Sequence, residues 1–185
     1  MPSAGATFRR VPPEEVARDL WRLLVAADRE FVPPLSSRND TTQADLDGAP
    51  AADAPAPGPT AYLASLLEQD LLVAEAGGRV VGLASFRPHH RVTLPDGAVL
   101  EPVTYLSTLI VDAEARGLGV ARGLYALLDE VAAAVGAPIV TRTWSTNHAH
   151  GRVLAAVGLR ELARIVDDRG PGVDTVYYVK ETGAP

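Results

Sequence analysis

The stretch that decides the fold runs from Leu109 to Gly123 and reads LIVDAEARGLGVARG. Its first three residues are large and aliphatic, which is typical of a buried β-strand. A short loop with two glycines follows and leads into a segment whose apolar residues recur every three or four positions, which is the helical period. The pattern predicts a strand, a tight loop and an amphipathic helix. The apolar positions of that helix are Val120, Leu124, Leu127, Leu128, Val131 and Val135.

The loop before this helix has the features of an anion site. The first turn of a helix has N–H groups without a partner in the helix, and the helix dipole gives that end partial positive charge. Gly117 and Gly119 remove side chains that would keep a phosphate away from the backbone. Arg116 and Arg122 add positive charge. The alternative is that the two glycines only form a tight structural turn.

The two common nucleotide-binding motifs fit this loop poorly. A mononucleotide P-loop requires Gly-Lys-Ser/Thr, and the chain has a single lysine, Lys180, far from the loop. A dinucleotide motif requires Gly-x-Gly-x-x-Gly, and Arg122 stands at the third glycine position. A nucleotide-dependent oxidoreductase therefore stays only as an alternative hypothesis, which tight NAD binding would support.

Two spaced motifs carry a resemblance to a known family. The first is Arg-x-x-Gly-x-Ala at residues 116–121, and the second is Asn-x-x-His-x-x-x-Leu-x-x-x-Gly-Leu at residues 147–159. They resemble the Arg/Gln-x-x-Gly-x-Gly/Ala and Asn-x-x-Ala/Ser-x-x-x-Tyr-x-x-x-Gly-Phe motifs of the GNAT superfamily of N-acetyltransferases. The expected order of elements also resembles that family from Thr7 to Val179, nearly the whole chain.

The resemblance implies a cofactor and the residues that hold it. It implies acetyl-CoA as co-substrate and no metal. It also implies that the strand before the loop separates from its neighbour and pairs with the pantetheine arm, while the loop amides hold the pyrophosphate. The residues implied for the arm are Leu109, Ile110 and Val111, with Asn147 beside them. Those implied for the pyrophosphate are Arg116, Gly117, Leu118, Gly119, Val120, Ala121 and Arg122.

The chain departs from the family at both usual acid–base positions. Leu154 stands where many members have a tyrosine that protonates the departing thiolate, and Ser107 aligns with a glutamate that serves some members as base. His150 shares a helical face with Asn147 and Leu154. Two interpretations of His150 stay open: it moves a proton, because a pKa near 6.5 suits neutral pH, or it is a partly buried packing histidine that hydrogen-bonds the backbone. The expected catalytic residues are Asn147, His150 and Ser107.

Composition and length bound the remaining possibilities. The 185 residues suit one domain, 1–185, and the Pro- and Ala-rich segment 44–60 predicts a mobile loop. The absence of cysteine excludes a disulfide scaffold, a thiolate metal site and a cysteine nucleophile. A net charge of −6 argues against nucleic acid. No export signal and no apolar run of membrane-spanning length is visible, so we expect a cytoplasmic protein without membrane contact.

The whole sequence predicts a mixed α/β fold, with a mostly antiparallel sheet flanked by helices. A late strand–helix–strand unit predicts one parallel, right-handed crossover. Strands are expected at 7–11, 71–76, 79–87, 103–111, 139–144, 159–166 and 173–179, with a further hairpin arm at 91–100. Helices are expected at 13–30, 62–69, 120–135 and 148–157.

The expected function is acetyl transfer from acetyl-CoA to a primary amine, by direct attack in a ternary complex. A non-catalytic acyl-CoA-binding regulatory domain is the alternative, favoured by Leu154 and Ser107. The acceptor is a small molecule or a peptide, and the acidic balance of the chain favours a cationic amine. The resemblance allows a homodimer. The sequence determines neither the acceptor nor the length of the acyl group.

Overall fold

A computed structural model describes residues 5–43, 46 and 58–182. Its strands are β1 (Thr7–Val11), β2 (Asp70–Ala76), β3 (Arg79–Thr93), β4 (Val99–Val111), β5 (Ile139–Trp144), β6 (Arg160–Ile165) and β7 (Thr175–Lys180). Its α-helices are α1 (Ala17–Ala27), α2 (Thr60–Leu67), α3 (Val120–Val135) and α4 (His148–Ala156). Short 3₁₀ turns lie at Pro13–Val16, Asp28–Glu30, Leu35–Ser37 and Ala113–Ala115.

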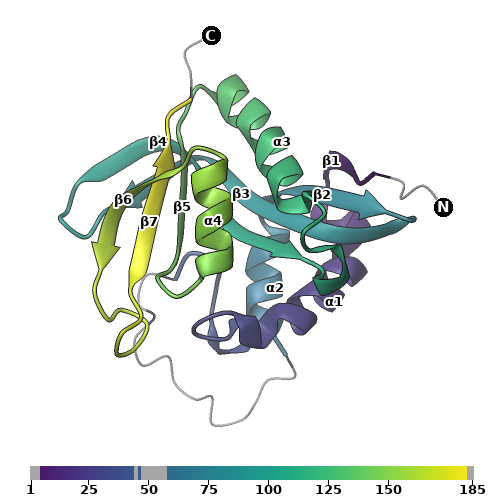
Figure 1. Ribbon diagram of the computed structural model, residues 1–185, viewed down its shortest axis with the longest axis horizontal. Coiled ribbons are helices and arrows are strands. Elements are labelled where there is room, and N and C mark those ends of the chain that lie inside the picture. Colours follow the sequence, from purple (N-terminus) through teal and green to yellow (C-terminus); the bar gives the residue numbers. More distant parts are fainter. Residues whose placement is uncertain (1–4, 44–45, 47–57, 183–185) are drawn as a thin grey trace.

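The described strands form one sheet in the order β1-β2-β3-β4-β5-β7-β6 (Figure 1). Every neighbouring pair is antiparallel except β4 and β5, which are parallel and are connected through α3. The predicted fold class and the predicted order of strands and helices are confirmed. The single parallel pair matters for function, because it lies at the centre of the sheet and directly before the glycine-bearing loop.

Helices cover both faces of the sheet, and β2 shows why. Side chains alternate between the two faces of a strand. Leu71 and Val73 belong to the core shared with α1 and α2, whereas Leu72 and Ala74 belong to the core shared with α3 and α4. All four are fully buried. A strand buried on both faces reads as a continuous apolar run, as this one does.

A third core cluster lies on the α1/α2 side of the sheet, under the other end of β4. Tyr105 belongs to it, while its neighbour Leu106 belongs to the α3/α4 core, so the two side chains point to opposite faces. Strands β5 and β7 contribute Val140 and Tyr177, and the outer part of the β3–β4 hairpin contributes Val92. This cluster supports the sheet under β5, β7 and the outer part of the β3–β4 hairpin.

The expected strands at 79–87, 91–100 and 103–111 are wrong in their boundaries. The structure has two long strands, β3 and β4, joined by a turn at 94–98. Register shifts near Arg87 and His90, with a positive φ of 53° at His89, let β3 pass Pro88 without ending. Such bulges accommodate residues that otherwise end a strand.

Only the ends of the expected mobile loop at 44–60 can be compared with the structure. Residues 44, 45 and 47–57 lie outside the described residues. Leu46 is 3 % exposed, Gly58 packs against the Trp21 ring, and α2 begins at Thr60, two residues earlier than expected. Both described ends of the segment are therefore packed against the domain. No helix in the described part of the chain is long and apolar enough to span a bilayer.

Candidate functional site

The site begins where the parallel pair β4–β5 comes apart. Pairing joins Thr104 to Ile139, Tyr105 to Val140 and Leu106 to Thr141, and then stops. At that last pair the Thr141 hydroxyl donates to the Leu106 carbonyl at 2.8 Å. A cavity of about 660 Å³ lies between the diverging strands, with residues 106–111 of β4 on one side and 141–144 of β5 on the other. The structure thus has the strand separation that the sequence resemblance implies.

Ser107 lies at the closed end of this gap. The register between β3 and β4 shifts there, because Ser85 pairs with Thr108 while Phe86 pairs with Leu106. The Ser107 hydroxyl donates to Oε1 of Gln69 at 2.7 Å and lies 2.8 Å from the Ser85 hydroxyl. Ser107 lines the cavity, but its described hydrogen-bond partners include no carboxylate or imidazole that could take its proton.

The other end of the cavity lies at the loop that opens α3. Gly117 and Gly119 have φ values of +76° and +82°, a region that L side chains rarely adopt. A Cβ on either glycine would meet no atom within 4 Å, so both face open space. The first turn of α3 has no acidic residue. Its unpaired N–H groups therefore open onto the cavity with their partial positive charge uncancelled.

Most of the cofactor residues implied by the resemblance meet at this cavity. The residues that line it are Leu109, Ile110, Val111, Arg116, Gly117, Gly119, Val120, Ala121, Arg122 and Asn147. Leu118 does not line it and is 70 % exposed. A backbone amide can serve an anion while its own side chain points to solvent, so this exposure is compatible with a role for the Leu118 amide alone.

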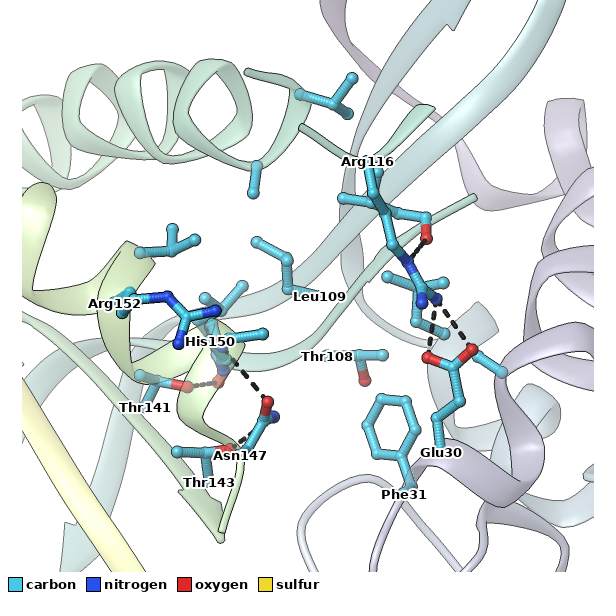
Figure 2. A pocket seen from close by; sticks show the side chains of 18 of the residues that line it. Glu30, Phe31, Thr108, Leu109, Arg116, Thr141, Thr143, Asn147, His150 and Arg152 are labelled. Carbon is cyan, nitrogen blue, oxygen red and sulfur yellow. Dashed lines mark hydrogen bonds and ion pairs between the residues drawn. The ribbon is translucent and has the colours of Figure 1, made fainter. Parts of the chain in front are cut away.

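The Arg116 side chain is occupied by a partner that sequence reasoning missed. Its Nη2 donates to both carboxylate oxygens of Glu30, at 2.8 and 2.6 Å, and its Nε donates to the Val111 carbonyl at 3.2 Å (Figure 2). The ion pair joins the loop to the end of the first helical segment. Arg122 and Arg152 are the other cavity-lining arginines near α3 and α4, and both are exposed.

Arg152 was not predicted, although the sequence holds a signal for it. Ala149, Arg152 and Val153 all line the cavity. Their spacing of three and four residues marks one face of α4. Figure 2 shows Arg152 beside His150 at the edge of the cavity, opposite Arg116. The motif alone directs attention to Asn147 and His150, whereas Arg152 lies on the neighbouring face that Ala149 and Val153 share.

Asn147 caps α4 and lines the cavity. Its Oδ1 accepts the His150 backbone N–H at 3.2 Å, which satisfies one of the free donors of the first turn. Its Nδ2 donates to the Thr143 hydroxyl at 3.2 Å. The two bonds fix the amide where β5 gives way to α4 (Figure 2), as the sequence predicts for a capping residue at this junction.

His150 lines the cavity but does not titrate where the sequence suggests. Its Nε2 lies 3.0 Å from the Tyr125 hydroxyl, and burial lowers its pKa to about 4. The surrounding protein thus disfavours the charged imidazolium near pH 6.5, and the expectation that His150 moves a proton stays a prediction. Leu154 is fully buried in the core between α3 and α4 and does not line the cavity. Leu154 is thus not a wall of the cavity.

An aromatic pair and an arginine form the far wall. Phe31 and Trp144 have ring centroids 5.3 Å apart, and both line the cavity together with Arg142. Phe31 and Arg142 were missed, because the first follows α1 and the second lies in β5, more than a hundred residues away. In the described residues no group of three or more His, Asp or Glu side chains is arranged to hold a metal ion.

Comparisons with known proteins agree with this geometry. The chain resembles an N-acetyltransferase from Staphylococcus aureus Mu50, with a TM-score of 0.66, 17 % identity, and coverage of 97 % of this chain and 99 % of that one. It also resembles yncA from Salmonella typhimurium, solved with its cofactor acetyl-CoA. That match has a TM-score of 0.63 and 19 % identity, and it covers 96 % of this chain and 94 % of that one. A third similar structure is ribosomal-protein-alanine N-acetyltransferase from Brucella melitensis. It matches with a TM-score of 0.63 and 21 % identity, over 95 % of this chain and 99 % of that one.

No curated protein sequence matches the chain significantly. The sequence profile of the Acetyltransferase (GNAT) family matches residues 39–158, which is more than half of the chain. The match includes the first motif, the second motif up to Gly158, the separated strands and the loop that opens α3. The protein is therefore a member of the GNAT family of acetyltransferases.

Proposed function

We propose that this protein transfers the acetyl group of acetyl-CoA to a primary amine, by direct attack within a ternary complex. One observation carries the proposal. Pairing between β4 and β5 stops at Leu106 and Thr141, and the cavity that opens there reaches the free N–H groups of α3. A long gap between strands with an anion site at one end fits an extended thioester that bears a pyrophosphate.

The residues present fit acetyl-CoA at each point along this gap. On the β5 side, the backbone of Leu109, Ile110 and Val111 has no strand to pair with and can bond the amides of a pantetheine arm. Gly117 and Gly119 leave room at the first turn of α3 for phosphate oxygens. The acetyl-CoA found in the Salmonella protein of the same fold supports this assignment.

The thioester would then lie near the closed end of the gap, beside Ser107 and His150. There a neutral amine would form a bond to the carbonyl carbon, the carbon–sulfur bond would break, and the proton lost by the amine would pass to the departing thiolate, which gives the amide and free CoA. Direct attack is favoured because the chain has no cysteine and because the Ser107 hydroxyl has no base among its described partners. The rate would rest mainly on orientation and on fixed hydrogen-bond donors.

A non-catalytic acyl-CoA-binding domain is the second candidate, and one observation favours it. Leu154 replaces the usual tyrosine of the second motif and lies in the core, so this position offers no acid to the cavity. A domain that kept the cofactor site and lost its acid would have the same cavity and loop.

Release of free CoA separates the two candidates. Acetyl-CoA binding would be measured by calorimetry, and CoA release would be followed with an amine library of amino acids, peptides, polyamines and hydrophobic amines. Amine-dependent release together with the acetylated amine in the mass spectrum supports the transferase. Tight binding without release for any amine supports the regulatory domain. No binding of acetyl-CoA overturns both.

A further inference from the structure

Three arginines from distant segments lie near the Phe31–Trp144 wall of the cavity. Arg38 follows the short turn at Leu35–Ser37, Arg142 lies in β5, and Arg169 lies between β6 and β7. Arg38 and Arg169 are each only 9 % exposed, and Arg142 is half-buried and lines the cavity. Buried guanidinium groups need partners, because they remain charged.

Two of the three, Arg38 and Arg169, share one hydrogen-bond acceptor. Nη2 of Arg38 and Nη1 of Arg169 both donate to the carbonyl oxygen of Val32, at 3.2 and 2.6 Å. The Arg38 guanidinium lies over the Phe31 ring and that of Arg169 lies over the Trp144 ring, at 5.4 and 5.7 Å. Since these two rings form the cavity wall, Arg38 and Arg169 lie directly behind it.

The three charges also act on one another and on a common neighbour. Burial, together with the charges of Arg38 and Arg142, lowers the pKa of Arg169 to about 9. Burial raises the pKa of Tyr105, and all three guanidiniums act in the opposite direction on this phenol. These mutual effects require close approach in a region shielded from water.

Their described hydrogen-bond partners are mostly backbone carbonyls. Arg38 donates to Pro33 and Val32, and Arg169 donates to Val32 and the Thr175 hydroxyl. Arg142 donates to the Gln43 carbonyl and is also hydrogen-bonded to the Tyr177 side chain. No carboxylate of the described residues forms an ion pair with any of the three. Asp168, bonded by the Thr175 hydroxyl, is the one described carboxylate whose charge favours Arg142 and Arg169. Among the described residues, one carboxylate thus faces three arginines.

This positive cluster reaches the cavity through Arg142. That residue follows Thr141, the last residue of β5 that pairs with β4, so it lies where the thioester and the amine would meet. A guanidinium has five N–H donors in a planar fork, which suits a carboxylate or a phosphonate. Arg38 and Arg169 lie too deep to line the cavity, but their charge adds to the attraction of an anion at Arg142.

We propose that the acceptor is an amine that also carries an anionic group, such as a free amino acid, and that Arg142 binds this group. The inference rests on the proposed transferase function and names its substrate class. It reverses the expectation from the net charge of −6, which favours a cationic amine. Net charge describes the whole surface, whereas the residues behind the Phe31–Trp144 wall set the local potential.

A matched series of acceptors tests the class. An amino acid, its amide and its decarboxylated amine share one side chain and differ in the anionic group. With acetyl-CoA held saturating, we expect kcat/KM to be at least ~10-fold higher for the amino acid, since a hydrogen bond to a charged group is worth about 1.5–3 kcal/mol. Equal or faster transfer to the amide or to the decarboxylated amine, across several side chains, would overturn the proposal while leaving the transferase function intact.

Variants of Arg142 test the residue. In Arg142→Gln we expect the preference for the amino acid over its amide to disappear through a higher KM, with the Kd for acetyl-CoA unchanged. Arg142→Lys keeps the charge but not the fork and should restore part of the preference. Arg160→Gln is the control, because Arg160 is exposed on β6 and its described ion pair is with Glu181 at 3.6 Å. Melting temperatures would show whether each variant folds.

Direct binding separates this proposal from the failure of the transferase function. Calorimetry would titrate the amino acid and its amide into the wild-type protein and into Arg142→Gln, both loaded with CoA. Binding of the amino acid alone, lost in Arg142→Gln, supports the anion site even if no amine is acetylated. Equal binding of both ligands, or binding of the amino acid that survives in Arg142→Gln, would contradict it.

Discussion

The Tyr125 hydroxyl and Nε2 of His150 lie 3.0 Å apart and connect α3 to α4 beside the cavity. Burial raises the pKa of Tyr125 far above its usual value, so the phenol keeps its proton and can donate to Nε2 or accept from it. Burial also lowers the pKa of His150 to about 4, which favours the neutral imidazole at pH 7. A neutral imidazole that accepts at Nε2 carries its proton at Nδ1. We expect this tautomer, in which Tyr125 donates to Nε2 and His150 is a neutral donor.

The first prediction follows from this tautomer. We expect His150→Ala to lower kcat by roughly 10²-fold, the size of the effect when one fixed donor is removed from a transition state. Tyr125→Phe should lower kcat by less, because the imidazole remains but its tautomer is no longer set. Neither change should alter the Kd for acetyl-CoA.

The pH profile of kcat is the measurement that tells a neutral donor from a proton shuttle. In both variants the profile should keep its shape near pH 6.5, since His150 does not titrate there in the wild-type protein. Loss of a limb near neutrality in His150→Ala would show that His150 ionises there after all. Unchanged kcat in both variants would reduce His150 to packing.

The second prediction concerns stability against pH. The pKa of His150 is about 4 in the folded protein and near 6.5 in the unfolded chain, so between these values the unfolded chain binds more protons. The free energy of unfolding contributed by this group is thus complete above pH 6.5 and falls as the pH drops to 4. The loss should reach about 3 kcal/mol.

Urea denaturation of the wild-type protein and of His150→Gln, at pH 7 and pH 4, measures this contribution. The carboxylates titrate alike in both proteins, so their effect cancels in the difference. We expect the wild-type protein to lose more stability than His150→Gln over this interval. Parallel losses would mean that the imidazole is hydrated in the folded protein.

The strand–loop–helix from Leu109 to Gly123 could be predicted because its signals are local. A short aliphatic run, two glycines and a helical period lie within a few turns of chain, and each depends on its own neighbours. Asn147 as a helix cap is local in the same sense, since its partner is the His150 N–H three residues later. The order of strands and helices could be predicted for the same reason.

The remaining features depend on residues that the fold brings together. The pKa of His150 depends on burial against α3, and the ion pair of Arg116 with Glu30 joins residues 86 positions apart. The arginine cluster combines three segments of the chain, so neither the net charge nor any local pattern reveals it. The length of β3 was missed because Pro88 reads as a strand breaker, and only the pairing with β4 shows that a bulge accommodates it.

The third prediction separates the two roles of Asn147. Asn147→Ala removes the cap and the bond to Thr143, and we expect a loss of about 1 kcal/mol in the free energy of unfolding. Acetyl-CoA binding should weaken as well, because the amide lines the cavity beside the separated strands. Asn147→Ser keeps a capping oxygen but loses the amide donor, so it should regain stability without regaining affinity. Calorimetry measures the affinity for acetyl-CoA, and thermal melting measures stability. If Asn147→Ser regains both, Asn147 acts only as a cap.

The last prediction concerns the anion loop. Gly119→Asp places a carboxylate at the first turn of α3, where it would repel the pyrophosphate and occupy its space. We therefore expect the Kd for acetyl-CoA to rise at least ~10-fold, or about 1.4 kcal/mol.

Gly97→Asp is a matched control, because Gly97 has a φ of +86° against +82° at Gly119, and a Cβ at either position meets nothing within 4 Å. Both variants carry the same backbone strain, which aspartate tolerates better than most residues, so their melting temperatures should fall alike. Since Gly97 lies in the β3–β4 turn and does not line the cavity, its variant should bind acetyl-CoA as the wild-type protein does. Equal affinities in the two variants would mean that the loop before α3 does not hold the pyrophosphate.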